Sequence, residues 1–150
     1  MLSFRTMKAQ DLDCVTAIEE AAGPHPWQNR NFADCLKPGY TCLIAELDDK
    51  PVGHGVIMSA AGEAHLLIIT VSKDCQGKGF GKEILRHLIA QARENAETMF
   101  LEVRASNRAA FNLYLQEGFS EIGRRKNYYP GNQDKKAEDA IVMALDLAYY

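Results

Sequence analysis

Residues 65–92 read HLLIITVSKDCQGKGFGKEILRHLIAQA and contain the most informative pattern of the chain. Its first seven residues are nearly all apolar or β-branched, which predicts a central strand covered on both faces. A loop with alternating glycines follows, at Gly77, Gly79 and Gly81. Beyond the loop, apolar residues recur on one face of a helix that ends near Asn95, in the stripe Ile84, Leu85, Leu88, Ile89 and Ala92. The order is therefore strand, glycine loop, helix.

Strands and helices alternate on both sides of this stretch. Further strands are expected around Phe4 and over residues 40–47, 52–60, 63–71, 99–103, 119–127 and 140–147, and further helices over residues 12–22, 31–36 and 107–117. The turn residues Asp48-Asp49-Lys50-Pro51 predict a hairpin between the second and third strands. Because a helix joins strand 63–71 to strand 99–103, this unit is a right-handed crossover that makes the two strands parallel neighbours. The pattern predicts the α/β class.

The composition is typical of one globular domain that spans residues 1–150. The chain has 47% hydrophobic and 25% charged residues, and no repeat or long linker interrupts it. Its net charge of −3 lacks the basic field on which direct nucleic-acid binding depends. No apolar run approaches the roughly 18 residues of a membrane span, and the first residues lack the apolar core of a signal peptide. We therefore expect a cytoplasmic protein without a membrane or nucleic-acid partner; its oligomeric state stays open, and a monomer is compatible with the sequence.

The cysteines and histidines form neither a disulfide framework nor a metal-binding pattern. The four cysteines contain no C-x-x-C pair, and no two of the four histidines have the close spacing of a helical metal pair. We therefore expect reduced cysteines and no metal ion.

The glycine loop is suited to bind an anion. Glycines let the backbone approach a phosphate closely, and the first N–H groups of the following helix supply donors. A tight turn without a ligand is the alternative. A nucleoside-triphosphate loop would need glycine in place of Gln76 and serine or threonine in place of Glu83, and a dinucleotide loop would need glycine in place of Lys82 or Ile84. Neither nucleotide motif fits.

Gln76, Gly79 and Gly81 do fit the pattern Gln/Arg-x-x-Gly-x-Gly/Ala, directly after a buried strand and at the start of an amphipathic helix. With this loop the chain resembles the GNAT superfamily of N-acetyltransferases over essentially its full length. The resemblance implies a mixed, mostly antiparallel sheet of six to seven strands, flanked by about four helices, with a parallel pair of strands at the cofactor site. It also implies that acetyl-coenzyme A (acetyl-CoA) is the cosubstrate and that the loop holds its pyrophosphate. The residues expected to bind it are Ile69, Thr70, Val71, Gln76, Gly77, Lys78, Gly79, Phe80, Gly81, Lys82 and Asn107.

Four further segments resemble one subfamily, namely LEVRASN at 101–107, NLYLQEGF at 112–119, NYYP at 127–130 and EDAIVMAL at 138–145. This is the RimI subfamily, which acetylates the N-terminal alanine of a small-subunit ribosomal protein. The resemblance implies the same acceptor and direct attack without an acyl-enzyme. Two positions depart from the subfamily: Ile68 stands where asparagine is usual, and Gly77 where a long polar residue is usual. Since neither change removes a backbone donor, we expect cofactor binding with altered affinity.

Acetyl transfer to an amine needs a base for the nucleophile and a proton for the leaving thiolate. Glu102 lies in mid-strand, on the face that it shares with Phe100 and Arg104. An ion pair with Arg104 would explain this carboxylate without catalysis, whereas the resemblance makes Glu102 the general base. Tyr114 lies on a helix where a core aromatic would suffice, and the resemblance makes it the proton donor to the coenzyme A sulfur. Asn107 is expected both to cap that helix and to contact the cofactor.

The acceptor site is expected near the last two strands. Tyr128 and Tyr129 are predicted to line the peptide groove, and an aromatic pair packed on the core is the alternative. Glu138 and Asp139, together with Glu63, are expected at the edges of the site, where they would favour a basic ribosomal-protein N-terminus. Two rival functions stay open: transfer to another amine, such as an internal lysine, a different protein N-terminus or a polyamine, and a non-catalytic module that binds coenzyme A. The presence of both candidate catalytic residues, Glu102 and Tyr114, argues against a non-catalytic module.

Overall fold

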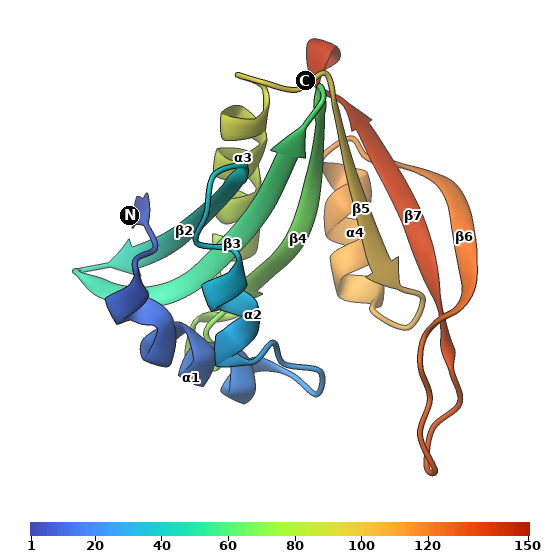
Figure 1. Cartoon of the computed structure of the whole chain (residues 1–150), viewed down its shortest axis with the longest axis horizontal. Coiled ribbons are helices and arrows are strands. Elements are labelled where there is room, and N and C mark those ends of the chain that lie inside the picture. The colour runs from blue at the N-terminus through green and yellow to red at the C-terminus, as the bar shows by residue number, and fades with distance from the viewer.

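The backbone forms one seven-stranded sheet in the order β1-β2-β3-β4-β5-β7-β6 (Figure 1). The computed structural model describes residues 1–150. The strands are β1 (Ser3–Thr6), β2 (Tyr40–Leu47), β3 (Lys50–Ala60), β4 (Glu63–Val71), β5 (Thr98–Arg104), β6 (Ser120–Tyr129) and β7 (Glu138–Asp146). The helices are α1 (Leu12–Ala22), α2 (Asn29–Asp34), α3 (Phe80–Ala92) and α4 (Arg108–Gln116), with short 3-10 turns at Ala9–Asp11, Lys73–Cys75 and Leu147–Tyr149.

The pairing of the strands confirms the predicted α/β fold class. β4 and β5 run parallel, and every other neighbouring pair is antiparallel. The predicted mixed, mostly antiparallel sheet with one parallel pair is therefore correct, as is the number of helices. None of these helices is long and apolar enough to span a membrane.

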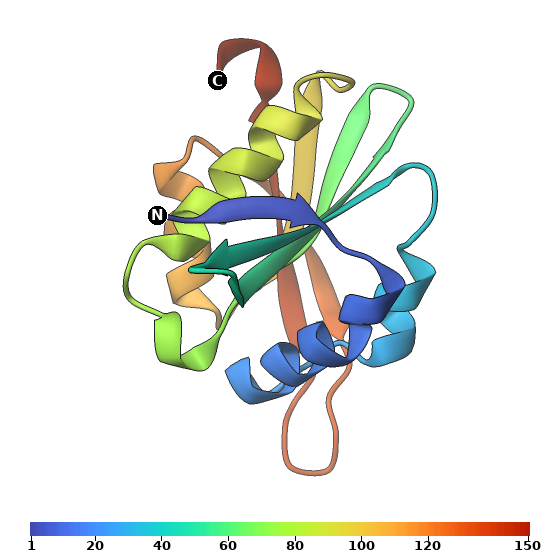
Figure 2. The same ribbon diagram turned by 90° about the vertical axis from the view of Figure 1, so that its left-hand side faces the viewer.

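Helices cover both faces of the sheet. α1 and α2 lie on one face, and α3 and α4 lie on the other (Figure 2). The alternation of β2 fits this arrangement, because Leu43 and Ala45 belong to the larger core under α3 while Cys42 and Ile44 belong to the smaller core under α1 and α2. The whole predicted stripe of α3, from Ile84 to Ala92, is buried.

Local signals set the turns and caps of these elements. The β2–β3 hairpin turns at Asp48 and Asp49, which have φ angles of 52° and 64°, so its two-residue turn has the left-handed backbone that suits twisted strands. The Asn107 side chain accepts from the Ala110 N–H at 3.2 Å and caps α4, as predicted. α4 is followed by Gly118 with a φ of 104°, which also agrees with the prediction.

The bounds of α2 and α3 differ from the sequence prediction. α2 spans Asn29–Asp34 rather than residues 31–36, because the Asn31 side chain accepts from the Gln28 N–H at 2.7 Å and starts the helix two residues earlier. α3 ends at Ala92, and the chain continues to Asn95 as an irregular turn in which the Asn95 N–H donates to the Ala92 carbonyl.

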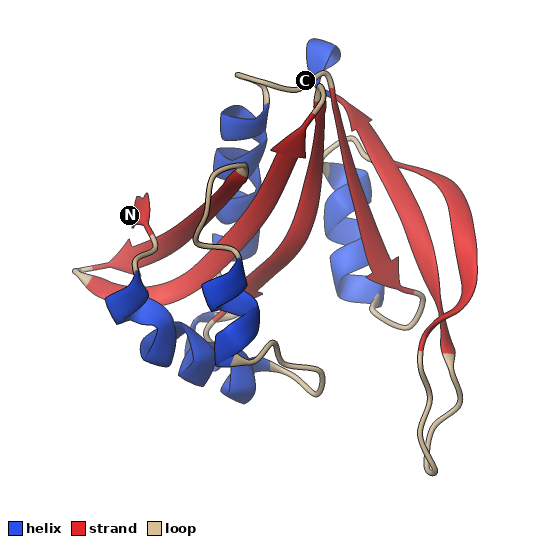
Figure 3. Ribbon diagram, viewed as in Figure 1, coloured by secondary structure: helices blue, strands red, loops and turns tan.

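β4 and β5 separate halfway along their length. They pair from Glu63 to Leu66 and from Thr98 to Leu101, and beyond this point they diverge (Figure 3). On the other side of β4, Val56 opposes Ile68 and Ile57 opposes Leu66, so Leu67 is an unpaired bulge residue.

The separation corrects one prediction from the sequence. β4 is the central strand, but its first half is covered on one face only. Ala64 and Leu66 on that face are buried, whereas the side chain of His65 between them is 39% exposed. Further along, Leu67 is 38% exposed and Ile68 to Val71 are half-buried. The apolar run of β4 reflects a strand that is packed in its first half and open to a cleft in its second.

The close approach of α3 to β3 depends on glycines in the strand. A Cβ on Gly55 would lie 2.6 Å from the Leu88 side chain, and a Cβ on Gly53 would lie 2.8 Å from both Ile84 Cδ1 and the Thr70 carbonyl oxygen. A backbone oxygen cannot move aside as a side chain can, so Gly53 is the more constrained position.

We expect Gly53→Ala to lower the free energy of unfolding by about 1–3 kcal/mol, because the added methyl group overpacks the contact between β3, β4 and α3. Urea denaturation followed by circular dichroism measures the change. Gly123→Ala is the matched control, since a Cβ there meets no atom within 4 Å, and it should stay within about 0.5 kcal/mol of the wild type. Equal stability of the two variants would contradict this account of the helix contact.

Candidate active site

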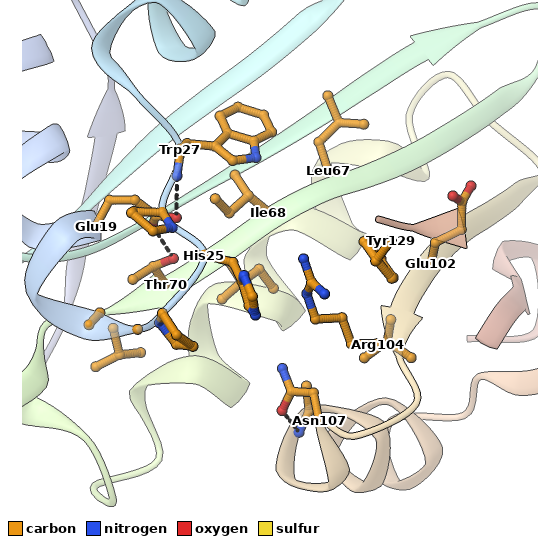
Figure 4. A pocket seen from close by; sticks show the side chains of 18 of the residues that line it. Glu19, His25, Trp27, Leu67, Ile68, Thr70, Glu102, Arg104, Asn107 and Tyr129 are labelled. Carbon is orange, nitrogen blue, oxygen red and sulfur yellow. Dashed lines mark hydrogen bonds between the residues drawn. The ribbon is translucent and has the colours of Figure 1, made fainter. Parts of the chain in front are cut away.

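A cleft of about 640 Å³ opens where β4 leaves β5. Its walls are the second half of β4, the end of β5 with the start of α4, and the loop between α1 and α2 (Figure 4). A second cavity of about 300 Å³ lies beside it, between the glycine loop and α4. The two share Ile69, Val71, Gln76, Ala110 and Tyr114, so they form one continuous groove.

The glycine loop presents unused backbone donors to this groove. Gly77 and Gly79 have φ angles of 78° and 83°, in the left-handed region that favours glycine. No N–H group from Gln76 to Gly79 donates to a protein acceptor, and the first bonded N–H at the start of α3 is that of Glu83, which donates to the Gly79 carbonyl at 3.2 Å. The Gln76 side chain donates to the Val71 carbonyl at 3.1 Å and ties the loop to β4. Such an array of N–H groups at a helix start is suited to an anion.

Ile69, Thr70 and Val71 line the cleft beyond the last residue that pairs with β5. Their backbone remains paired with β3 on the opposite side. The edge that faces the cleft is therefore the edge that β5 has left, and its N–H and C=O groups are directed to the groove.

Glu102 lies on β5, half-buried, and lines the cleft. Its carboxylate makes no ion pair, because Arg104 pairs instead with Glu138 at 3.4 Å and lies over the Tyr129 ring at 4.1 Å. The alternative of a Glu102–Arg104 pair is therefore wrong. The Glu102 carboxylate stabilises the protonated phenol of Tyr128 and raises the pKa of that group.

Tyr114 lies on α4 at the junction of the two cavities. Its ring packs edge-on against Phe119 with 5.8 Å between ring centres, so the expected core contact is present. Burial raises the pKa of Tyr114 to about 12. The hydroxyl is thus protonated at neutral pH, and no protein acceptor takes its hydrogen bond.

The remaining predicted site residues divide between the groove and other places. Asn107, Tyr129, Gly77, Gly79, Phe80 and Gly81 line the groove, whereas Lys78 and Lys82 are exposed beside it. Glu138 lies in an outer cavity of about 560 Å³ that adjoins the cleft. Tyr128 and Asp139 line none of these cavities.

The acidic residues expected at the acceptor site have structural partners. The Glu138 carboxylate accepts from the Ser106 N–H at 2.7 Å, and this bond together with Arg104 lowers its pKa. Asp139 accepts from the N–H of Asn127, whose φ is 51°, at 3.0 Å. Glu63 lies at the paired end of β4, away from the cleft. Glu138 lines the outer cavity, whereas Glu63 and Asp139 line none of the three cavities, and a role of Glu138 and Asp139 in acceptor binding stays a prediction.

The structure adds Glu19 of α1 to the site, which the sequence pattern did not single out. Glu19 is 6% exposed and lines the cleft on the wall opposite Glu102 (Figure 4). Its position four residues after the buried Val15 places it on the packed face of α1. A carboxylate on the packed face of a helix is the signal by which the sequence could have pointed to Glu19.

No group of three or more histidine, cysteine, aspartate or glutamate side chains has the arrangement to hold a metal ion. The four cysteines are free.

The sequence is similar to known proteins over most of its length. Residues 8–119 match the model of the acetyltransferase (GNAT) family. The chain is 36% identical over 149 residues to the ribosomal protein bS18-alanine N-acetyltransferase of Salmonella typhimurium, with 99% of both chains covered. The enzyme of that name from Escherichia coli is 35% identical, also with 99% of both chains covered.

Solved structures show the same relationship. The crystal structure of the ribosomal-protein-S18-alanine N-acetyltransferase from Escherichia coli superposes with a TM-score of 0.90 at 35% identity, over 98% of this chain and 94% of that one. A spermidine N-acetyltransferase chimera superposes with a TM-score of 0.87 at 18% identity, over 99% and 97% of the two chains, which shows a shared fold. With the family model matched over most of its length and relatives above 30% identity over nearly all of it, this chain belongs to the GNAT family of acetyltransferases.

Proposed function

We propose that this protein transfers the acetyl group of acetyl-CoA to the N-terminal alanine of the ribosomal protein bS18, the substrate in the names of its relatives. The observation that carries the proposal is the continuous groove in which the glycine loop, Tyr114 and Glu102 follow one another. The whole chain, residues 1–150, would act as one catalytic domain in the cytoplasm. Its net charge of −3 favours a protein acceptor over nucleic acid.

Acetyl-CoA would supply the activated thioester and occupy the length of the groove. The free N–H groups from Gln76 to Gly79 would hold the pyrophosphate. The open edge of β4 at Ile69 to Val71 would bind the pantetheine arm and the thioester oxygen through its backbone. Asn107 keeps its side-chain NH₂ group available to the cofactor while its oxygen caps α4.

Glu102 would accept the proton of the attacking amine, directly or through a water molecule. An α-amino group has a pKa of about 8, so at neutral pH most of it is protonated and must lose a proton before it attacks. Glu102 has no cationic partner to hold it in an ion pair, and it faces the cleft. A carboxylate of ordinary strength suffices for this task.

Tyr114 would donate to the sulfur of coenzyme A as the thioester breaks. Its raised pKa keeps the phenol protonated and therefore ready to donate throughout the neutral range. The unpaired hydroxyl needs no rearrangement to form a hydrogen bond with the developing thiolate. Attack by the amine, proton loss to Glu102 and proton gain by the sulfur then complete the transfer without an acyl-enzyme.

The acceptor is tested with paired basic peptides and acetyl-CoA, read by mass spectrometry. One peptide begins with a free alanine, and its twin has a blocked N-terminus and an internal lysine. We expect a mass shift on the free-alanine peptide alone. Acetylation of the blocked twin would indicate a lysine acetyltransferase. Tight coenzyme A binding with no turnover on any amine would instead support a non-catalytic module.

Glu102→Gln should lower kcat by about 100-fold or more while leaving the Kd for acetyl-CoA unchanged, because the base is lost and the cofactor contacts remain. The residual rate should rise up to pH values near the amine pKa of about 8, where solvent supplies the neutral amine. Steady-state kinetics against pH and calorimetry measure the two quantities. Wild-type turnover across the pH range would remove Glu102 from the mechanism.

Tyr114→Phe should slow the chemical step by about 10-fold or more, because the proton donor is lost while the ring contact with Phe119 is kept. Single-turnover kinetics isolate this step from product release. Thermal unfolding serves as the control, since phenylalanine retains the packing and should leave the Tm close to that of the wild type. An unchanged single-turnover rate would assign Tyr114 to the core alone.

A further inference from the structure

Glu19 is a buried carboxylate that the mechanism above does not use. One of its oxygens, Oε1, accepts from the Thr70 hydroxyl at 2.6 Å and lies 3.2 Å from His54 Nε2. The other, Oε2, accepts from the Trp27 N–H at 3.1 Å. Figure 4 shows the hydrogen bonds of the Glu19 carboxylate with Thr70 on β4 and with the Trp27 N–H of the α1–α2 loop.

The neighbours of Glu19 keep its carboxylate ionised and hydrogen-bonded. Burial alone would raise its pKa, but the interactions with His54, Thr70 and Trp27 outweigh burial, and the pKa is lowered. With donors on both oxygens, this carboxylate is a poor proton acceptor. Glu19 therefore acts on the reaction through the groups that it holds, in contrast to Glu102.

Two of these groups belong to adjoining walls of the cleft, on the side that faces Glu102. Thr70 lies on β4 in the part that β5 has left. Trp27 ends the segment 23–27 of the α1–α2 loop, which lines the cleft. Within that segment, the bond from the Trp27 N–H to Glu19 is the one hydrogen bond that restrains the backbone. Both walls thus depend on the same carboxylate.

His54 is the third residue beside the Glu19 carboxylate. It is fully buried on β3, where it is the register partner of Thr70, and its ring packs edge-on against Phe32 at 5.1 Å. His54 Nε2 is 3.2 Å from Glu19 Oε1 but makes no hydrogen bond with it, so the Thr70 hydroxyl is the group of the sheet that holds Glu19 by a hydrogen bond.

We infer that Glu19 is a positioning residue that fixes the α1–α2 loop relative to the open edge of β4, and so sets the position of the loop wall of the cleft against which the acceptor would bind. The inference rests on the proposed acetyl transfer and adds a determinant of acceptor binding to it. It predicts that the hydroxyl of Thr70 contributes to acceptor affinity without any contact with the acceptor, and that it contributes little to acetyl-CoA affinity, for which the backbone of β4 suffices.

Thr70→Val tests the inference, since it removes the hydroxyl and keeps a β-branched side chain in the strand. The KM for the acceptor should rise about three- to tenfold, as expected for one lost hydrogen bond. The Kd for acetyl-CoA should stay within about twofold. Thr70→Ser keeps the hydroxyl and should restore the acceptor KM.

Thr16→Val is the matched control. The Thr16 hydroxyl lies on the same helix as Glu19, but it donates to the Leu12 carbonyl at 2.7 Å and does not line the cleft. This variant should leave both kinetic constants unchanged. An acceptor KM of Thr70→Val equal to that of Thr16→Val, or a parallel loss of acetyl-CoA affinity, would overturn the inference.

Amide hydrogen exchange tests the inference independently of which acceptor the protein uses. Exchange at the Trp27 N–H should accelerate about three- to tenfold in Thr70→Val, because Glu19 loses one of its restraints. It should be unchanged in Thr70→Ser and in Thr16→Val. If the wild type acetylates no alanine peptide, the proposed function fails, and this exchange pattern alone decides the role of Glu19. An exchange rate of the Trp27 N–H in Thr70→Val equal to that of the wild type would refute the positioning role of Glu19.

Discussion

The short parallel pairing of β4 with β5 is the constraint on which the rest of the site depends. Four residues of each strand pair, and then the strands diverge around the bulge at Leu67. A strand that loses a neighbour within a sheet exposes a row of backbone donors and acceptors that need new partners. In this protein the divergence creates the cleft, and the exposed edge of β4 is the wall to which a ligand backbone or thioester can bind.

The same divergence explains how one cleft holds two carboxylates with different properties. Glu102 extends from β5 into the opened space and has no cationic partner, because Arg104 is taken by Glu138 and Tyr129. Glu19 lies on α1 beside β4. Thr70, Trp27 and His54 surround its carboxylate, and its pKa is lowered. The chemistry available to each group follows from its surroundings rather than from its residue type. A carboxylate without a cationic partner can accept a proton, whereas one that is already ionised and hydrogen-bonded on both oxygens is a poor proton acceptor.

Local patterns predicted the elements because their causes are local. The period of the apolar residues, the turn residues and the Asn107 cap depend on a few neighbouring residues, so the strands, the crossover and α4 could be assigned correctly. The glycine loop was predictable for the same reason, since Gly77 and Gly79 are required by their own backbone angles. The roles proposed for Glu102 and Tyr114 came from a family resemblance, and the structure shows that both residues line the same cleft.

The α/β class, the order of the elements, the family and the position of the glycine loop could all be predicted from the amino-acid sequence. The packed structure was needed to show where β4 parts from β5, that Arg104 pairs with Glu138, and that Glu138 and Asp139 accept from the backbone N–H groups of Ser106 and Asn127. Glu19 is the clearest case, because its partner Thr70 lies 51 residues away in the chain. A contact of that separation has no local signature, since it forms only when the helix, the sheet and the loop have packed together.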